Sequence, residues 1–259
     1  MSKRVAILGC GPAGLLAAHA ARQNGCDFRI FSKKRPSHLF GAQYLHAPIT
    51  GVTTHPEVVR YALEGSPEEY RQKVYGDEWD GTISAEDLEA DHHAWDIRAA
   101  YRELWDMYNS LIFDTDFYGG EQQVDNMIKG AGVDLVISSV PRTVWKRPGD
   151  KFEQAKIWAI GDAPDLGQFV PFSPTEDNMV LCNGMSDISW YRTSKVFGFS
   201  TVEYPWGKKP PIEGIQEVIK PLRCSAKGGA DFMHVGRYGK WEKGVLTTDA
   251  FDDALKATA

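Results

Sequence analysis

The chain has 259 residues, 42% of them hydrophobic and 25% charged, which is the composition of a globular protein with an ample core. Its formal net charge of -6 at pH 7 argues against an extended nucleic-acid-binding surface. No apolar run approaches the length of a membrane span, no signal-type segment stands at the N-terminus, and the four cysteines lack C-x-x-C spacing. We therefore expect a cytoplasmic protein without disulfides and without membrane contact.

The first segment, VAILGCGPAG, predicts a buried strand that runs into a glycine-rich turn and then a helix. The residues of its G-x-G-x-x-G motif are Gly9, Gly11, Pro12, Ala13 and Gly14. The first glycine permits a tight turn, the second lets the backbone approach a pyrophosphate, and the third lets helix and strand pack closely. With the strand-like CDFRIF that follows the helix, the pattern predicts a dinucleotide site with a pyrophosphate at the helix N-terminus.

The end of the second predicted strand leaves the choice of dinucleotide open. A ribose-binding acid is usual there, but this chain has Ser32, followed by Lys33, Lys34 and Arg35. A serine hydroxyl can still bond a ribose, which keeps FAD as an interpretation, whereas basic residues suit the 2′-phosphate of NADP. For the three basic side chains taken alone, we favour a solvated turn.

Residues 47–129 have a different character and predict a mostly helical cap. Two polar, helix-like stretches cover 66–76 and 84–112. In the second stretch, apolar residues recur at roughly helical spacing and predict one face of an amphipathic helix; they are Trp95, Ala99, Leu104, Trp105 and Tyr108.

Residues 130–259 return to strand-like patterns. GAGVDLVISSVP predicts a buried strand, and four further strands are expected over 156–162, 178–184, 188–198 and 199–205. ADFMHVGRYG predicts a strand that enters a second glycine turn, and a helix capped by Thr247 or Thr248 follows it.

These patterns together predict an α/β fold. We expect a Rossmann-type domain with a parallel sheet, formed by residues 1–46 and 130–259, with substrate-facing strands at about 156–206. A metal site is not expected, because the adjacent His92 and His93 point in different directions on a helix and His234 is isolated.

Several segments resemble flavoproteins of the UDP-galactopyranose mutase and amine-oxidase superfamily. In chain order they are VAILGCGPAGLLAAHAA, FGAQYLHAPI, DLVISSVP, WYRTSKVFGFSTVEYP and VGRYGKWEKGVLTTDAFDDAL, about half of the chain. The resemblance implies an FAD-binding fold with the first glycine turn at the pyrophosphate. It further implies that Gly41, Ala42 and Gln43 lie near the flavin, and that Gly236 and Arg237 approach its ribityl chain or pyrophosphate. Ser32 departs from the family's usual glutamate and the chain is far shorter, so the substrate does not transfer.

His46 and Arg192 are the candidates on the substrate side. His46 follows the flavin-facing segment and can bond the flavin or a substrate anion; a histidine satisfied within its loop is the alternative. Arg192 can hold a phosphate or carboxylate, and a surface ion pair with Glu203 is the alternative. Asp162, in a Gly-Asp pair, is a weaker candidate for the ribityl hydroxyls.

The expected function is that of an FAD-dependent oxidoreductase acting on a small polar substrate, such as an amine or a nucleotide-linked molecule. Three alternatives stay open: a redox-neutral mutase-like flavoenzyme, an NADP-binding reductase, and a non-catalytic nucleotide-binding protein. The sequence does not specify the oligomeric state.

Overall fold

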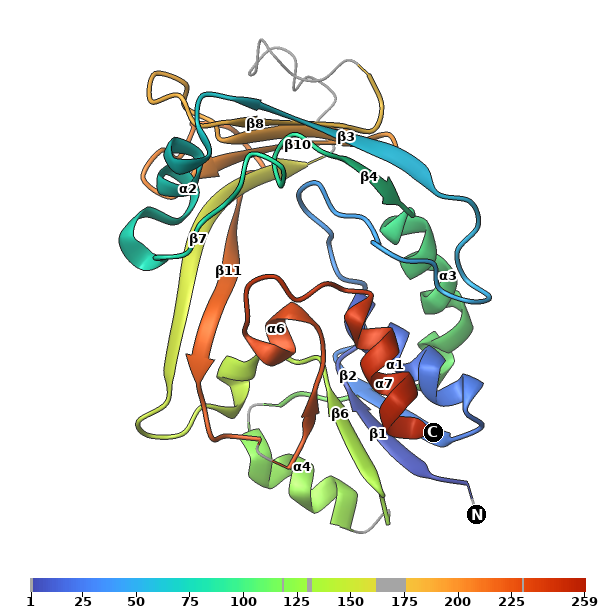
Figure 1. The fold of residues 1–259 in the computed structure, drawn as a ribbon. Helices are drawn as coiled ribbons and strands as arrows, with labels where there is room; N and C mark the ends of the chain where they lie inside the picture. The colour runs from blue at the N-terminus through green and yellow to red at the C-terminus, as the bar shows by residue number, and fades with distance from the viewer. Residues whose placement is uncertain (1, 118, 130–131, 162–175, 230) are drawn as a thin grey trace.

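Two sheets build the molecule. The computed structural model describes residues 2–117, 119–129, 132–161, 176–229 and 231–259. In this part of the chain a five-stranded parallel sheet has the order β12-β6-β1-β2-β5, and a seven-stranded sheet has the order β11-β7-β10-β9-β8-β3-β4 (Figure 1). The expectation of an α/β fold with a parallel sheet and a second, β-rich part is confirmed.

The parallel sheet is built around the first predicted strand. Its strands are β1 (Arg4–Leu8), β2 (Asp27–Ser32), β5 (Ile112–Asp114), β6 (Leu135–Ser138) and β12 (Met233–His234). Helix α1 (Pro12–Gln23) follows β1, and its small buried alanines let it pack closely against neighbouring helices α3 (Ile97–Tyr108) and α7 (Asp249–Thr258). The first and last helices of the chain therefore share one layer (Figure 1).

The seven-stranded sheet is the second sheet of the molecule. Its strands are β3 (Glu57–Glu64), β4 (Asp91–Ala94), β7 (Lys151–Gly161), β8 (Met179–Asn183), β9 (Arg192–Val196), β10 (Phe199–Pro205) and β11 (Gln216–Ser225). Neighbouring strands are antiparallel except β3 and β8, which run parallel. The predicted strands β7 to β10 are confirmed, and β3 and β11 are additional.

Shorter elements connect the sheets. They are α2 (Pro67–Tyr75), α4 (Gly120–Lys129), α6 (Gly236–Lys240) and the 3-10 helices η1 (Gly76–Glu78), η2 (Asn109–Leu111) and η3 (Arg142–Trp145). The α2 helix was predicted, and a capping box formed by Ser66 and Glu69 fixes its start. No helix in the described ranges has the length and apolar character that crossing a membrane requires.

The predicted helix over 84–112 is wrong in its first half. Residues 91–94 form β4, and α3 begins only at Ile97 because the Asp96 side chain accepts hydrogen bonds from the N–H groups of Arg98 and Ala99. The predicted face is therefore displaced: Trp95 precedes the helix and Ala99 is exposed. The buried face consists of Ile97, Ala100, Tyr101, Leu104 and Tyr108.

Residues 47–129 contribute to both sheets as well as to three helices. Strands β3 and β4 pair in the seven-stranded sheet, and β5 pairs with β2 in the parallel one. The division of the chain into an FAD domain and a helical cap stays a prediction.

Candidate functional site

The three glycines of the first turn have three different environments. A Cβ atom on Gly14 would lie 2.1 Å from the carbonyl oxygen of Gly9, and one on Gly9 would lie 2.4 Å from Ser139 Oγ. Gly9 also has a φ of +100°, which favours glycine. Around Gly11 the only described atom within 4 Å of such a Cβ is Ser37 Oγ, at 3.4 Å. The first and third glycines thus allow tight packing, whereas the second leaves its backbone approachable.

The start of α1 is left without a side-chain cap. Gly11 is the N-cap residue, and Pro12 and Ala13 begin the first turn. No described side chain caps the N–H groups at this N-terminal end of the helix. The N–H groups of this turn and the helix dipole therefore face the space above Gly11, and both favour an anion there.

The second glycine turn lies against the first. Gly236 has a φ of +69°, and a Cβ atom on it would lie 2.5 Å from the Cβ of Ala13. The Arg237 guanidinium extends from this turn and donates to the carbonyl of Pro221 on β11 at 3.3 Å. The structure therefore brings Gly236 to the start of α1 and directs Arg237 toward the seven-stranded sheet.

Ser32 and Lys33 lie at the carboxyl end of β2, beside acidic residues at the end of β5 and just after it. Ser32 pairs in register with Asp114, whose carboxylate accepts a hydrogen bond from the Lys34 N–H at 3.3 Å. Lys33 Nζ lies 3.0 Å from a carboxylate oxygen of Asp116. The sequence interpretation missed these two acids because β5 was not predicted.

The segment with Gly41, Ala42 and Gln43 lies on the seven-stranded sheet. Gly41 is buried with a φ of +81°, and a Cβ on it would be 3.2 Å from Glu203 Oε1 and 3.4 Å from Arg192 Nη2. The Gln43 side chain turns back and donates to the carbonyl of Phe40. The positive φ and the tight contact with this ion pair both favour glycine at position 41.

Arg98, at the start of α3, is a residue that sequence reasoning missed. Its guanidinium donates to the carbonyls of Leu39, Gly41 and Gln43 at 2.9, 3.1 and 3.4 Å. It also lies over the ring of Phe199 on β10, 3.7 Å from the ring centroid. The sequence shows only an arginine in a polar helix and gives no signal of this contact.

A buried ionic cluster lies beneath Gly41. Arg192 Nε donates to Glu203 Oε2, and Lys220 Nζ lies 3.5 Å from Glu203 Oε1 and donates to the Tyr191 hydroxyl at 2.8 Å. The Glu203 and Lys220 side chains are 4% and 10% exposed. The ion pair weighed as the alternative for Arg192 is therefore present, but it is buried and not on the surface. Lys220 was missed because β11 was not predicted.

The charges in this cluster shift both its acid and its amine. Burial favours the neutral carboxyl of Glu203, but the cations Arg192 and Lys220 outweigh it and hold the pKa of Glu203 at about 2. Burial lowers the pKa of Lys220 to about 7, aided by Arg192 and Arg237 and opposed by Glu203. One carboxylate thus faces two cations, and one of these cations titrates near neutral pH.

His46 belongs to a group of aromatic rings at the β3–β4 edge. Its ring centroid lies 4.4 Å from that of Tyr44 and 6.5 Å from that of His92. The His92 ring in turn meets Tyr61 edge to face at 5.2 Å. His46 is exposed overall, but its loss of hydration against these rings and the charge of His92 lower its pKa. The imidazole is therefore favoured in its neutral form.

Two other sequence expectations concern a metal site and Asp162. Within the described ranges no group of three histidine, cysteine or acidic side chains lies close enough to hold a metal ion. Asp162 lies outside the described residues.

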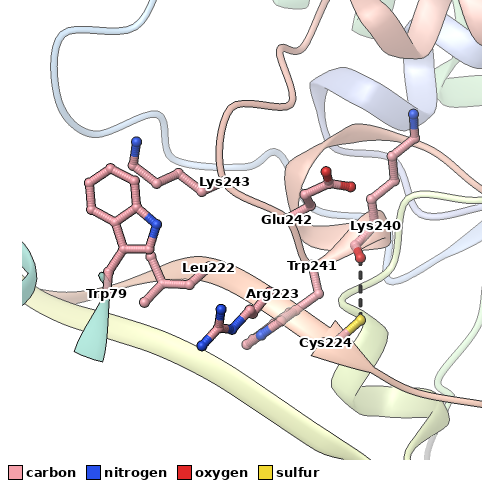
Figure 2. Close-up of a pocket in the computed structure, with 8 residues that line it drawn as sticks. All are labelled: Trp79, Leu222, Arg223, Cys224, Lys240, Trp241, Glu242 and Lys243. Carbon is pink, nitrogen blue, oxygen red and sulfur yellow. Dashed lines mark hydrogen bonds between the residues drawn. The ribbon is translucent and has the colours of Figure 1, made fainter. Parts of the chain in front are cut away.

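A pocket of about 430 Å³ lies at the far end of α6 and contains none of the predicted site residues. Its lining residues are Trp79, Leu222, Arg223, Cys224, Lys240, Trp241, Glu242 and Lys243 (Figure 2). The Lys243 ammonium lies 3.8 Å from the centroid of the Trp79 ring, and Cys224 Sγ donates to the carbonyl of Lys240. The pocket is separate from the paired glycine turns.

Comparison with known proteins gives a likeness of fold. No family model matches the chain, and no curated protein matches it in sequence. Tetracycline destructase Tet(51) matches with a TM-score of 0.52 at 9% identity, over 100% of this chain and 81% of that one. A variant of Klebsiella pneumoniae HpxO complexed with FAD matches with a TM-score of 0.51 at 13% identity, over 99% of this chain and 80% of that one.

These two likenesses define a class of fold. The chain has a Rossmann-type α/β fold similar to that of HpxO, a protein solved with FAD bound. Neither match is named as a UDP-galactopyranose mutase or an amine oxidase, so that narrower assignment stays a prediction.

Proposed function

We propose that this protein is an FAD-dependent oxidoreductase that acts on a small polar substrate. The observation that carries the proposal is the contact of Gly236 with Ala13, which sets two glycine turns side by side at the start of α1. Uncapped N–H groups and a backbone freed of side chains form a cradle of the kind that a dinucleotide pyrophosphate requires. The likeness of fold to FAD-bound HpxO supports the same cofactor.

The residues present fit the rest of the cofactor. The backbone of Gly11 and Ala13 would bind the pyrophosphate, Ser32 would bond the adenosine ribose, and Gly41 to Gln43 would lie along the ring system. FAD supplies the hydride-accepting chemistry when bound, and the protein contributes binding, orientation and charge.

The surroundings of Lys33 favour FAD over NADP. Its ammonium is already paired with Asp116 at 3.0 Å, so a 2′-phosphate would have to compete with that carboxylate and would meet its negative charge. An adenosine without a 2′-phosphate avoids this repulsion.

The chain's own residues have three proposed roles. The cluster of Arg192, Glu203 and Lys220 carries excess positive charge beneath Gly41, which stabilises negative charge that develops above it. Lys220 Nζ can hold or release a proton near neutral pH. His46, with its lowered pKa, can accept a proton beside Tyr44 and His92.

The test is the visible absorption spectrum of the purified chain before and after addition of FAD and removal of the excess. We expect bound-flavin bands near about 370 and 450 nm. Gly11→Ala should lose most of the binding, because its Cβ meets only Ser37 Oγ in the protein but would stand in the pyrophosphate's path. The matched control is Gly207→Ala, where the added Cβ meets nothing within 4 Å. A chain that is colourless after FAD has been added and the excess removed contradicts the proposal.

Steady turnover then separates the redox and redox-neutral forms of the proposal. An oxidoreductase consumes a reductant or acceptor stoichiometrically with product, whereas a mutase-like enzyme turns over with neither consumed. We expect consumption.

A further inference from the structure

Arg98 lies between the two sheets and contacts the segment proposed to face the flavin. Its guanidinium donates to the carbonyls of three alternate residues, Leu39, Gly41 and Gln43. The segment turns at Gly41, which has a φ of +81° and accepts a hydrogen bond from the Gln43 N–H at 2.8 Å, and this turn leaves all three carbonyls within reach of a single planar donor group.

The other contacts of Arg98 fix the guanidinium itself. One face lies on the Phe199 ring of β10, 3.7 Å from the centroid. The helix that carries it, α3, packs against α1 in the layer of the parallel sheet. The side chain therefore spans from the helix layer of the dinucleotide motif to the second sheet.

Gly41 is held from two directions. Arg98 bonds its carbonyl oxygen at 3.1 Å, and the Arg192–Glu203 pair lies directly against its Cα, where a Cβ would be 3.2 Å from Glu203 Oε1. Movement of the segment toward either side would break hydrogen bonds or collide with the buried ion pair. The backbone at this point is therefore restrained from both sides.

We infer that Arg98 is a positioning residue: it fixes residues 39–43 against both sheets and thereby sets where the flavin-facing backbone stands, without itself touching the cofactor. The expected effect of Arg98 on FAD binding rests on the proposed function, whereas its effect on residues 39–43 concerns the protein alone. Lysine cannot replace arginine here, because an ammonium lacks the planar fork that reaches three carbonyls and stacks on Phe199.

The first measurement is hydrogen exchange of the peptide spanning residues 39–45 in the cofactor-free protein. The amides of Gln43 and Leu45 are bonded to the carbonyls of Gly41 and Trp95 at 2.8 and 2.9 Å, so both report on the segment. Arg98→Lys should exchange at least tenfold faster in this peptide, and Arg98→Ala faster still. Arg102→Lys is the matched control, since Arg102 is an exposed arginine one turn along the same helix.

A folded Arg98→Lys protein whose 39–45 peptide exchanges like wild type overturns the inference. If Arg98→Ala does not fold, Arg98→Lys alone decides, because it keeps the charge and the long side chain.

The second measurement is FAD titration followed by flavin fluorescence and visible circular dichroism. We expect Arg98→Lys to weaken FAD binding about tenfold and to change the dichroic spectrum, whereas Arg102→Lys changes neither. Unaltered affinity and spectrum in Arg98→Lys also overturn the inference. Failure of the wild-type chain to bind FAD contradicts the proposed function instead, and the exchange result still decides whether Arg98 holds the segment.

Discussion

Gly236 and Ala13 lie in contact, although they come from opposite ends of the chain. A Cβ atom on Gly236 would approach the Ala13 Cβ to 2.5 Å, which is closer than two carbon atoms can pack. This contact brings the second glycine turn to the uncapped start of α1. It is also the contact through which the C-terminal part of the chain completes the proposed cofactor site.

Replacement of Gly236 by alanine should therefore destabilise the fold and weaken FAD binding together. The added methyl collides with Ala13, and the φ of +69° disfavours any residue with a Cβ, so we expect a loss of roughly 1–3 kcal/mol. The free energy of unfolding from urea denaturation measures the loss. In the double variant Gly236→Ala with Ala13→Gly, the collision is relieved and part of the stability should return. Strictly additive effects would show that the two residues are not coupled.

Glu203→Gln should be strongly destabilising at neutral pH. Removal of the carboxylate leaves Arg192 and Lys220 close together and buried, and loss of one partner from a buried ion pair costs about 3–5 kcal/mol. Glu57→Gln is the matched control because Glu57 is an exposed glutamate on β3.

The same carboxylate should give the wild type a characteristic acid sensitivity. Its folded-state pKa is about 2 and its ordinary value is 4.5, so its stabilising contribution is complete above pH 4.5 and is lost as the pH falls toward 2. The loss is on the order of 3 kcal/mol. Comparison of urea unfolding of the wild type and Glu203→Gln across this range measures it, and equal pH slopes would contradict the assignment.

Lys220 should make the free energy of unfolding depend on pH at higher pH values, in this case because burial of an amine lowers its pKa. Its folded-state pKa of about 7 lies below the ordinary 10.5, so between these values the unfolded chain binds more protons than the folded one. Stability conferred by this site therefore rises as the pH increases above 7. Lys220→Met has a side chain of similar length without a titrating group, and its unfolding free energy should lack this rise. Only the pH slopes are compared, because the variant also leaves the Tyr191 hydroxyl without its donor.

Asp114 should supply the acidic character that Ser32 lacks at the end of β2. Its carboxylate stands in register with Ser32 on the neighbouring strand, where it can accept a hydrogen bond from the adenosine ribose. Asp114→Asn is expected to weaken FAD binding about tenfold and leave FMN binding unchanged, because FMN has no adenosine. Asp106→Asn, an exposed aspartate on α3, is the control for general charge effects. Equal losses for FAD and FMN would place the effect elsewhere.

Elements with a strong local pattern were predicted well. The strand, turn and helix from Arg4 to Gln23 follow from an apolar run, three spaced glycines and small helix-forming residues. The strands β6 to β10 likewise have clear patterns, and α2 has its capping box. Helix α7 follows Thr248 as predicted, but the Thr248 side chain makes no capping hydrogen bond. The start of α3 was misplaced because the helical spacing of apolar residues includes Trp95, whereas the Asp96 side chain caps the helix and makes it begin at Ile97.

Strand β11 shows why other parts could not be predicted. Its sequence, QEVIKPLRCS, mixes apolar and polar residues without regular alternation, contains Pro221 and has an irregular register there against β7. Pairing with β7 supplies hydrogen bonds and burial that the local sequence of β11 does not predict. Lys220, which β11 carries into the ionic cluster, was hidden for the same reason.

The sequence by itself determined the dinucleotide motif and the class of fold, because a turn, a helix start and a buried strand depend on residues close together in the chain. Only the tertiary structure decided that Gly41 lies over Arg192 and Glu203, that Arg98 bonds the segment around it, and that Asp114 stands beside Ser32. Those contacts join residues far apart in sequence, and they exist because strand pairing and the packing of a loop and a helix against the second sheet bring these residues together. Local patterns specify each sheet's elements, but the packing of these elements in three dimensions selects which side chains meet.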